Sequence, residues 1–154
     1  MSSDLFDLGG KVALVTGGNA GLGQGIAVAL AKAGADIAVA SRQPASETAA
    51  LVRALGRRCV EIQADLSSIE PIPRMIEETL SGLGRLDILV NNAGTIRRAD
   101  AVDFSEQDWD DVMNVNLKSA FFLCQAAGRH FIANGGGKII NIASMLSFQG
   151  GIRV

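Results

Sequence analysis

Short, mostly apolar runs alternate with helical patterns along the chain, and this alternation constrains the fold more than any other feature. Strands are expected at the apolar runs of residues 12–15, 37–40, 59–62, 86–90 and 138–143. Helices are expected at residues 21–33, 45–55, 70–83 and 106–133. A strand without polar alternation is buried on both faces, so the pattern predicts a parallel sheet with helices on both sides.

Right-handed crossovers restrict such a chain to a doubly wound, Rossmann-type α/β fold. A length of 154 residues suits one domain, and no internal repeat or linker divides it, so residues 1–154 are expected to form a single dinucleotide-binding domain. Ligands of this fold bind at the carboxyl ends of the strands. Polar and glycine residues follow the apolar runs there, which predicts one cleft: Thr16-Gly17, Ser41-Arg42, Asp65, Asn91-Asn92-Ala93-Gly94 and Ser144.

Composition excludes several classes of partner. A net charge of −2 and an isoelectric point of about 5.3 argue against nucleic-acid binding. No apolar run is long enough to span a bilayer, and residues 1–7 lack the pattern of a leader, so a cytoplasmic location without membrane contact is expected. Cys59 and Cys124 show no metal-ligand spacing and are interpreted as small apolar residues in a reducing compartment, so no metal site is expected.

Gly17, Gly21 and Gly23 form a T-G-x-x-x-G-x-G segment between the first expected strand and helix. The first glycine permits a turn without Cβ crowding, and the second lets backbone N–H groups approach a pyrophosphate. The third allows close contact between helix and sheet. The alternative is a tight strand-to-helix turn without a ligand.

The second expected strand ends in Ser41-Arg42 rather than in the acidic residue that usually holds the ribose 2′-OH of NAD. Ser41 could donate a hydrogen bond to a 2′-phosphate, and Arg42 could bind it or stack on adenine. This pair favours NADP. A solvated surface arginine is the alternative.

The glycine segment, Asn91-Asn92-Ala93-Gly94 and Ile142-Ala143-Ser144 resemble, in that order, the landmarks of the short-chain dehydrogenase/reductase family. The resemblance implies the strand order 3-2-1-4-5, with two further strands beyond Val154. It also implies that Asn91 braces the sheet. Asp65 would accept a hydrogen bond from adenine, although an ordinary turn or capping aspartate explains that residue equally well.

The resemblance also assigns roles to individual residues. Ser144 would orient a substrate carbonyl, and Asn116 would support a water chain that relays protons. Asparagine is a poor helix former, and Asn116 is expected to point inward with its amide hydrogen-bonded, although bracing the helix is an alternative. The implied cofactor contacts are Thr16, Gly17, Asn19, Gly21, Leu22, Gly23, Ser41, Arg42, Asp65, Leu66, Asn91, Ala93 and Gly94.

Residues 95–100, 108–113 and 142–151 resemble a branch of the family that acts on sugar acids of the 2-deoxy-D-gluconate or 2-dehydro-3-deoxy-D-gluconate type. The expected reaction is hydride transfer between a nicotinamide and a secondary alcohol or ketone. Enzymes of that branch are generally NAD-linked, so NADP and NAD both remain open. Arg97, Arg98 and Arg153 flank the expected strand ends and are candidates for binding the substrate carboxylate. Arg97 is the first choice, with Met145 as a second substrate contact. A regulatory nucleotide-binding module and a reductase of another ketone, such as a 3-oxoacyl thioester, are the alternatives.

The sequence contains no tyrosine. In the family a Tyr-x-x-x-Lys pair follows the serine, and the tyrosine exchanges a proton with the alkoxide. We therefore expect this sequence to be the N-terminal part of a longer dehydrogenase, inactive by itself because the pair is absent. The resemblance implies a homotetramer for the full-length enzyme, with the expected helix 106–133 near a subunit interface.

Overall fold

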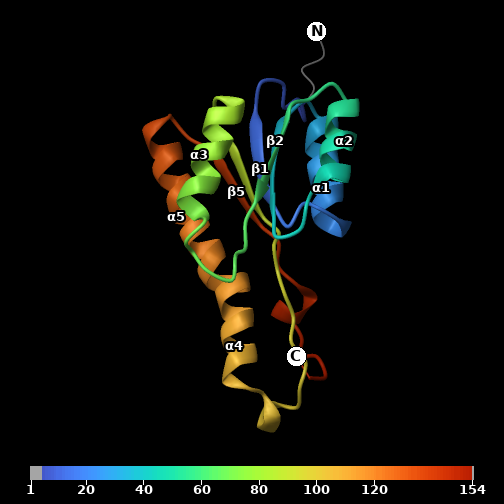
Figure 1. Cartoon of the computed structure of the whole chain (residues 1–154), viewed down its shortest axis with the longest axis vertical. Coiled ribbons are helices and arrows are strands. Elements are labelled where there is room, and N and C mark those ends of the chain that lie inside the picture. Colours follow the sequence, from blue (N-terminus) through green and yellow to red (C-terminus); the bar gives the residue numbers. More distant parts are fainter. Residues whose placement is uncertain (1–4, 154) are drawn as a thin grey trace.

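The computed structural model describes residues 5–153, and part of the N-terminal segment considered for a leader lies outside them (Figure 1). Within the described residues, five strands form one parallel sheet in the order β3-β2-β1-β4-β5, which confirms the predicted topology. The strands are β1 (Val12–Thr16), β2 (Asp36–Ser41), β3 (Cys59–Gln63), β4 (Ile88–Asn91) and β5 (Lys138–Asn141). The α-helices are α1 (Gly21–Lys32), α2 (Ser46–Ala54), α3 (Ile72–Leu83), α4 (Glu106–Met113) and α5 (Ser119–Ala133).

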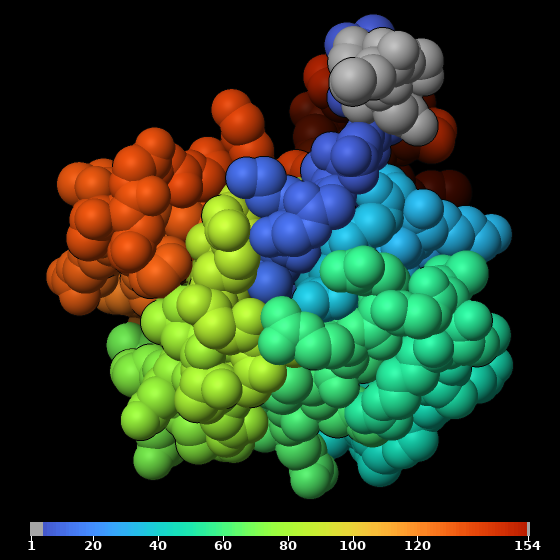
Figure 2. Space-filling view, turned by 90° about the horizontal axis from the view of Figure 1, so that it is seen from above, coloured from blue at the N-terminus to red at the C-terminus, as the bar shows by residue number. Residues whose placement is uncertain are grey.

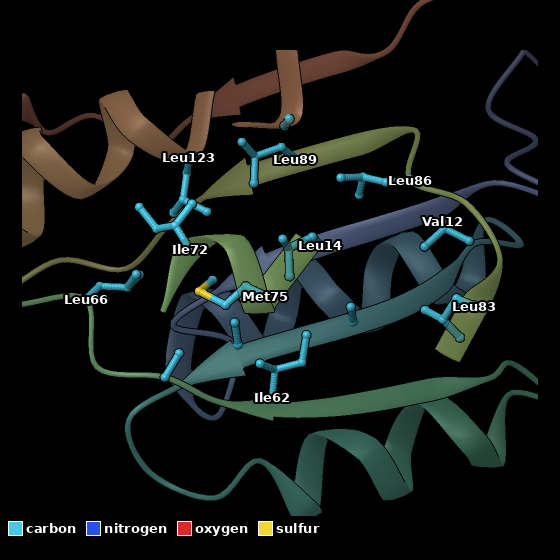
Figure 3. Packing of buried hydrophobic residues seen from close by; sticks show 14 of the residues in the cluster. Val12, Leu14, Ile62, Leu66, Ile72, Met75, Leu83, Leu86, Leu89 and Leu123 are labelled. Atoms are coloured by element: carbon cyan, nitrogen blue, oxygen red, sulfur yellow. The ribbon is translucent and has the colours of Figure 1, made fainter. Parts of the chain in front are cut away.

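Helices cover both faces of the sheet, with α1 and α2 on one side and α3 and α5 on the other (Figure 1). Side chains of β1 alternate between the two layers: Leu14 packs with Met75 and Leu123 on one face, and Val15 packs with Ala27 on the other. Figure 3 shows the first of these clusters, to which α3 contributes Met75. In β1, β2 and β4, burial on both faces explains why the strands lack polar alternation.

The expected helix 106–133 is continuous but not uniformly α-helical. A π-helical segment, η2 (Asn114–Lys118), separates α4 from α5 and contains Asn116. Its last residue is followed directly by Ser119 in helical conformation, so the axis continues. Single π turns inside helices occur frequently at functional sites because the extra residue redirects side chains. Apolar periodicity could not predict this segment.

The strand β5 is an edge of the sheet. Among the described residues it pairs only with β4, and all four of its residues are exposed. Short 3-10 helices lie after β4 and β5, η1 (Ala101–Asp103) and η3 (Met145–Ser147). None of the helices within residues 5–153 is long and apolar enough to cross a bilayer.

At the amino ends of the strands, buried Asp36 joins β2 to the turn before β3. Arg57 and Arg58 each lie 2.8 Å from its carboxylate, and Arg58 also donates to the carbonyl of Leu83 at the end of α3. Figure 2 views this end, where the turn before β3 (green) approaches the segment after α3 (yellow-green). Burial alone raises the pKa of Asp36, but hydrogen bonds and charge from the two arginines outweigh it and hold the pKa below its usual value.

We expect Asp36→Asn to lower the free energy of unfolding by about 1.5–3 kcal/mol at neutral pH, the range for hydrogen bonds to charged groups. A lowered native pKa gives stability that is present above the unfolded pKa and lost as pH falls through the native value. Urea unfolding should therefore show the variant and the wild type converging in acid. Asp110→Asn, at an exposed side chain without a described partner, should change little. A constant difference between Asp36→Asn and wild type down to pH 3 would contradict the ion-pair argument.

Candidate active site

Two adjoining cavities lie at the carboxyl ends of the strands. The smaller, about 480 Å³, is lined by the loops after β1, β2 and β3, including Asn19, Arg42 and Asp65. The larger, about 1650 Å³, lies between the segment after β4, the helices α4 to α5, and the segment after β5. The cavities share four lining residues, Ala93, Gly94, Thr95 and Arg97. The predicted cleft is thus a pair of cavities that meet on the segment after β4.

The glycine segment brings β1 close to the segment after β4. Gly17 has φ +63°, and a Cβ there would lie 3.0 Å from the Cα of Ala93. A Cβ on Gly23 would collide with the Gly17 carbonyl and the Asn92 amide. The roles predicted for the first and third glycines, a crowded turn and a close helix contact, are confirmed.

The amino end of α1 has no side-chain cap. Its N-cap residue is Ala20, whose side chain cannot accept a hydrogen bond, and the first turn contains no acidic residue. The first N–H groups of a helix have no partner within the helix, and the helix dipole adds partial positive charge there. This end of a twelve-residue helix therefore suits an anion.

Thr16 connects β1 to the segment after β4. Its hydroxyl donates to the carbonyl of Val90 at 3.3 Å and accepts from the backbone N–H groups of Asn92 and Ala93, each at 3.0 Å. The side chain is buried and lines neither cavity. Thr16 therefore acts by holding Ala93 in place, and the direct cofactor contact predicted for it finds no support.

The two adjacent asparagines brace different parts of the sheet. Asn91 donates to Asn141 Oδ1 at 2.8 Å, and this bond joins β4 to β5 as the family resemblance implied. Asn92 donates to the carbonyls of Thr16 at 2.9 Å and Gly17 at 3.2 Å. The bracing role of Asn92 was missed in the sequence, where only its position after a buried strand pointed to it.

The end of β2 differs in part from its prediction. The buried Ser41 donates its hydroxyl to the carbonyl of Gln43 at 2.7 Å, so that proton is used within the turn. The neighbouring Arg42 is exposed and lines the smaller cavity, as does Leu66. Asp65 accepts from the N–H of Ser67 at 2.9 Å, and this bond and the charge of Arg42 lower the pKa of its carboxyl. Asp65 is thus a turn residue that also faces the cavity.

Asn116 and Ser144 both line the larger cavity, and Leu22 lies in the same lining. The amide of Asn116 accepts from the N–H of Thr95 and donates to its carbonyl, both at 2.8 Å. The predicted hydrogen bonding of Asn116 is confirmed, but the predicted burial is wrong, because η2 turns this side chain to the exposed cavity wall. The Ser144 oxygen accepts from the N–H of Leu146 at 3.2 Å.

The two predicted substrate contacts need correction. The guanidinium of Arg97 lies 3.3 Å from Asp108 and 2.9 Å from Asp111, so its charge is already neutralised by two carboxylates. Met145 is exposed and lines neither cavity, because η3 directs the next residue, Leu146, to the larger one. Arg153, an alternative to Arg97 in the sequence analysis, lines this cavity.

These features define a doubly wound α/β domain with two adjoining cavities at the carboxyl ends of its strands. The chain belongs to the short chain dehydrogenase family, whose model matches residues 11–154. The 2-dehydro-3-deoxy-D-gluconate 5-dehydrogenase of Escherichia coli (strain K12) is 61% identical over 150 residues, which are 97% of this chain and 59% of the relative. The chain therefore spans about three fifths of the length of this curated relative.

Solved structures share the fold closely. One from Agrobacterium tumefaciens, provisionally a 2-deoxy-D-gluconate 3-dehydrogenase with bound NADP, is 49% identical with a TM-score of 0.87, over 98% of this chain and 60% of that chain. The carveol dehydrogenase of Mycobacterium avium in complex with NAD is 30% identical with a TM-score of 0.88, over 95% of this chain and 58% of that chain.

Two glycines of α1 provide a matched test of the close contact between helix and turn. Gly23→Ala should destabilise the protein by about 1–3 kcal/mol, the usual cost of overpacking, because the new methyl group meets backbone and amide atoms. Gly25→Ala, where a Cβ meets nothing within 4 Å, should be neutral or stabilising by about 0.5–1 kcal/mol. Denaturant unfolding measures both. Equal effects would mean that the contact at Gly23 relaxes without cost.

Proposed function

We propose that this chain is the nucleotide-binding part of an NAD(P)-dependent dehydrogenase. Its reaction would transfer a hydride between the nicotinamide and a secondary alcohol or ketone of a 2-deoxy-D-gluconate-type sugar acid. The observation that carries the proposal is the meeting of a polar cavity and a larger cavity on Ala93, Gly94 and Thr95. The names of the relatives, which include sugar-acid dehydrogenases, support the substrate class.

The residues of the smaller cavity fit a dinucleotide. The uncapped amino end of α1 and the turn at Gly17 would hold the pyrophosphate, with Asn19 beside them. Arg42 and Asp65 would hold the adenosine end, and the exposed guanidinium of Arg42 suits a 2′-phosphate. When bound, a nicotinamide nucleotide supplies or accepts the hydride.

Ser144 and Asn116 would act on the substrate side. The Ser144 oxygen accepts a hydrogen bond from Leu146 and donates to no described residue, so its proton is available to a substrate oxygen. Donation there would stabilise negative charge that develops on that oxygen. Asn116 donates one amide proton to the carbonyl of Thr95, and the second amide proton can bind a water in the cavity.

The proton exchanged with the substrate needs another group. The sequence contains no tyrosine, and its one histidine, His130, lies on α5 beside Asn134, outside both cavity linings. We propose that the acid/base belongs to the full-length protein, a cytoplasmic homotetramer. The exposed Trp109, Leu117 and Phe121 along α4 to α5 line the larger cavity, and a neighbouring subunit would cover their apolar surface.

The activity is tested by assaying residues 1–154 beside the full-length protein with 2-deoxy-D-gluconate and NAD or NADP. We expect turnover by the full-length protein only, because no phenol in residues 1–154 can exchange the proton. A 3-oxoacyl thioester serves as the competing substrate. Turnover by residues 1–154 within tenfold of full length would contradict the assignment of the acid/base. Preference for the thioester would overturn the sugar-acid proposal.

Cofactor preference should depend on Arg42. An arginine that pairs with a 2′-phosphate contributes about 1.5–3 kcal/mol, so Arg42→Ala should weaken NADP binding about ten- to a hundredfold and leave NAD binding nearly unchanged. Calorimetric titration of the full-length protein with each nucleotide measures this. Arg129→Ala, at an exposed arginine on α5, is the control. Tighter binding of NAD than of NADP by the wild type would overturn the assigned role of Arg42.

A further inference from the structure

We propose that Arg153 binds the carboxylate of the sugar acid and that Asp100 positions its guanidinium. The proposal rests on the proposed function and adds the group that would select an acidic substrate. Both residues line the larger cavity together with Asn116 and Ser144. They come from segments far apart in the sequence, which lie side by side in Figure 1 as the yellow stretch before α4 and the red end of the chain.

An anionic substrate in this cavity needs a cation, and among the described residues the lining contains two arginines, Arg97 and Arg153. Each of the three guanidinium nitrogens of Arg97 already has a partner. Two carboxylates take its Nε and one terminal nitrogen, while the other terminal nitrogen donates to Thr95 and to the carbonyl of Ile96. A third carboxylate there would meet net negative charge.

Arg153 is engaged at one edge only. Its Nε donates to Asp100 Oδ1 at 2.8 Å, and its two terminal nitrogens have no partner among the described residues. The end of the guanidinium therefore keeps the two parallel donors that bind a carboxylate in bidentate fashion. With 61% of the side chain exposed, this end is accessible from the cavity.

The backbone at Arg153 differs from that of the other non-glycine residues that the structure describes. Arg153 has φ +61°, and no other non-glycine residue in the described part of the chain has a positive φ. This left-handed conformation is less favourable for a residue with a Cβ than for glycine. Here it accompanies the ion pair between residues 53 positions apart.

The test is steady-state kinetics of the full-length protein with 2-deoxy-D-gluconate and with the neutral polyol 2-deoxy-D-glucitol. Arg153→Gln should raise KM for the acid about ten- to a hundredfold, as for a lost charged hydrogen bond, with a much smaller effect on the polyol. KM for the nucleotide should not change. Arg153→Lys should show a smaller loss than Arg153→Gln, because lysine keeps the positive charge but lacks the two parallel donors of the guanidinium. Asp100→Asn should raise KM for the acid less, with kcat retained.

Arg98→Gln is the matched control, because Arg98 is exposed in the same segment as Arg97 and lines neither cavity. Equal losses for acid and polyol in Arg153→Gln would overturn the proposal, as would a selective loss in Arg97→Gln instead. A rise confined to KM for the nucleotide would mean that Arg153 binds a cofactor phosphate.

Calorimetric titration of the nucleotide-bound protein with 2-deoxy-D-gluconate separates the two proposals. Wild-type binding without turnover would contradict the proposed reaction alone, and its loss in Arg153→Gln would still support the carboxylate site. Absence of wild-type binding would overturn both.

Discussion

The site depends on the buried hydroxyl of Thr16. At the switch point, the loops after β1 and β4 run to opposite sides of the sheet. The backbone hydrogen bonds between the two strands end there, so side chains must hold the following segments together. Thr16 supplies it by accepting two backbone N–H groups after β4 while Asn92 returns bonds to the glycine turn. Because these groups are shielded from water, each lost partner would leave an unsatisfied donor or acceptor. The wall shared by the two cavities is thereby fixed to the centre of the sheet.

This dependence explains why glycine is needed both in the turn after β1 and at the start of α1. The connection brings Ala93 against Gly17 and the Asn92 amide against Gly23, at distances that leave no room for a Cβ. The strongest sequence signal of the chain, the glycine spacing, is therefore a consequence of close packing between a turn and a neighbouring loop. A pattern of this kind lies within a short stretch of sequence, so it can be recognised without knowledge of the tertiary structure.

The sequence predicted the sheet order, the helices and the gathering of polar residues at the strand ends, because burial on two faces and right-handed crossovers leave few alternatives. It failed where the outcome depends on residues distant in the chain. The charge of Arg97 was visible, but not its neutralisation by Asp108 and Asp111 across the loop. The burial expected of Asn116 assumed α-helical periodicity, which η2 interrupts. Leu146 lines the larger cavity in place of the predicted Met145 because of the short 3-10 helix η3.

Different interactions fix the loops that form the two cavities, and this difference suits the cavities to different roles. Strand ends and the buried Thr16 fix the smaller cavity, whereas three side-chain connections close the loops of the larger: Asn116 with Thr95, Arg97 with two aspartates, and Arg153 with Asp100. Exposed hydrogen bonds and ion pairs of this kind contribute little to stability, so a few substitutions can replace them with others. A fold built in this way can keep one nucleotide cleft and change its substrate through the loops. Selection for an acidic substrate would then require only one arginine whose terminal nitrogens stay unpaired, and the ion pair with Asp100 leaves Arg153 in that state.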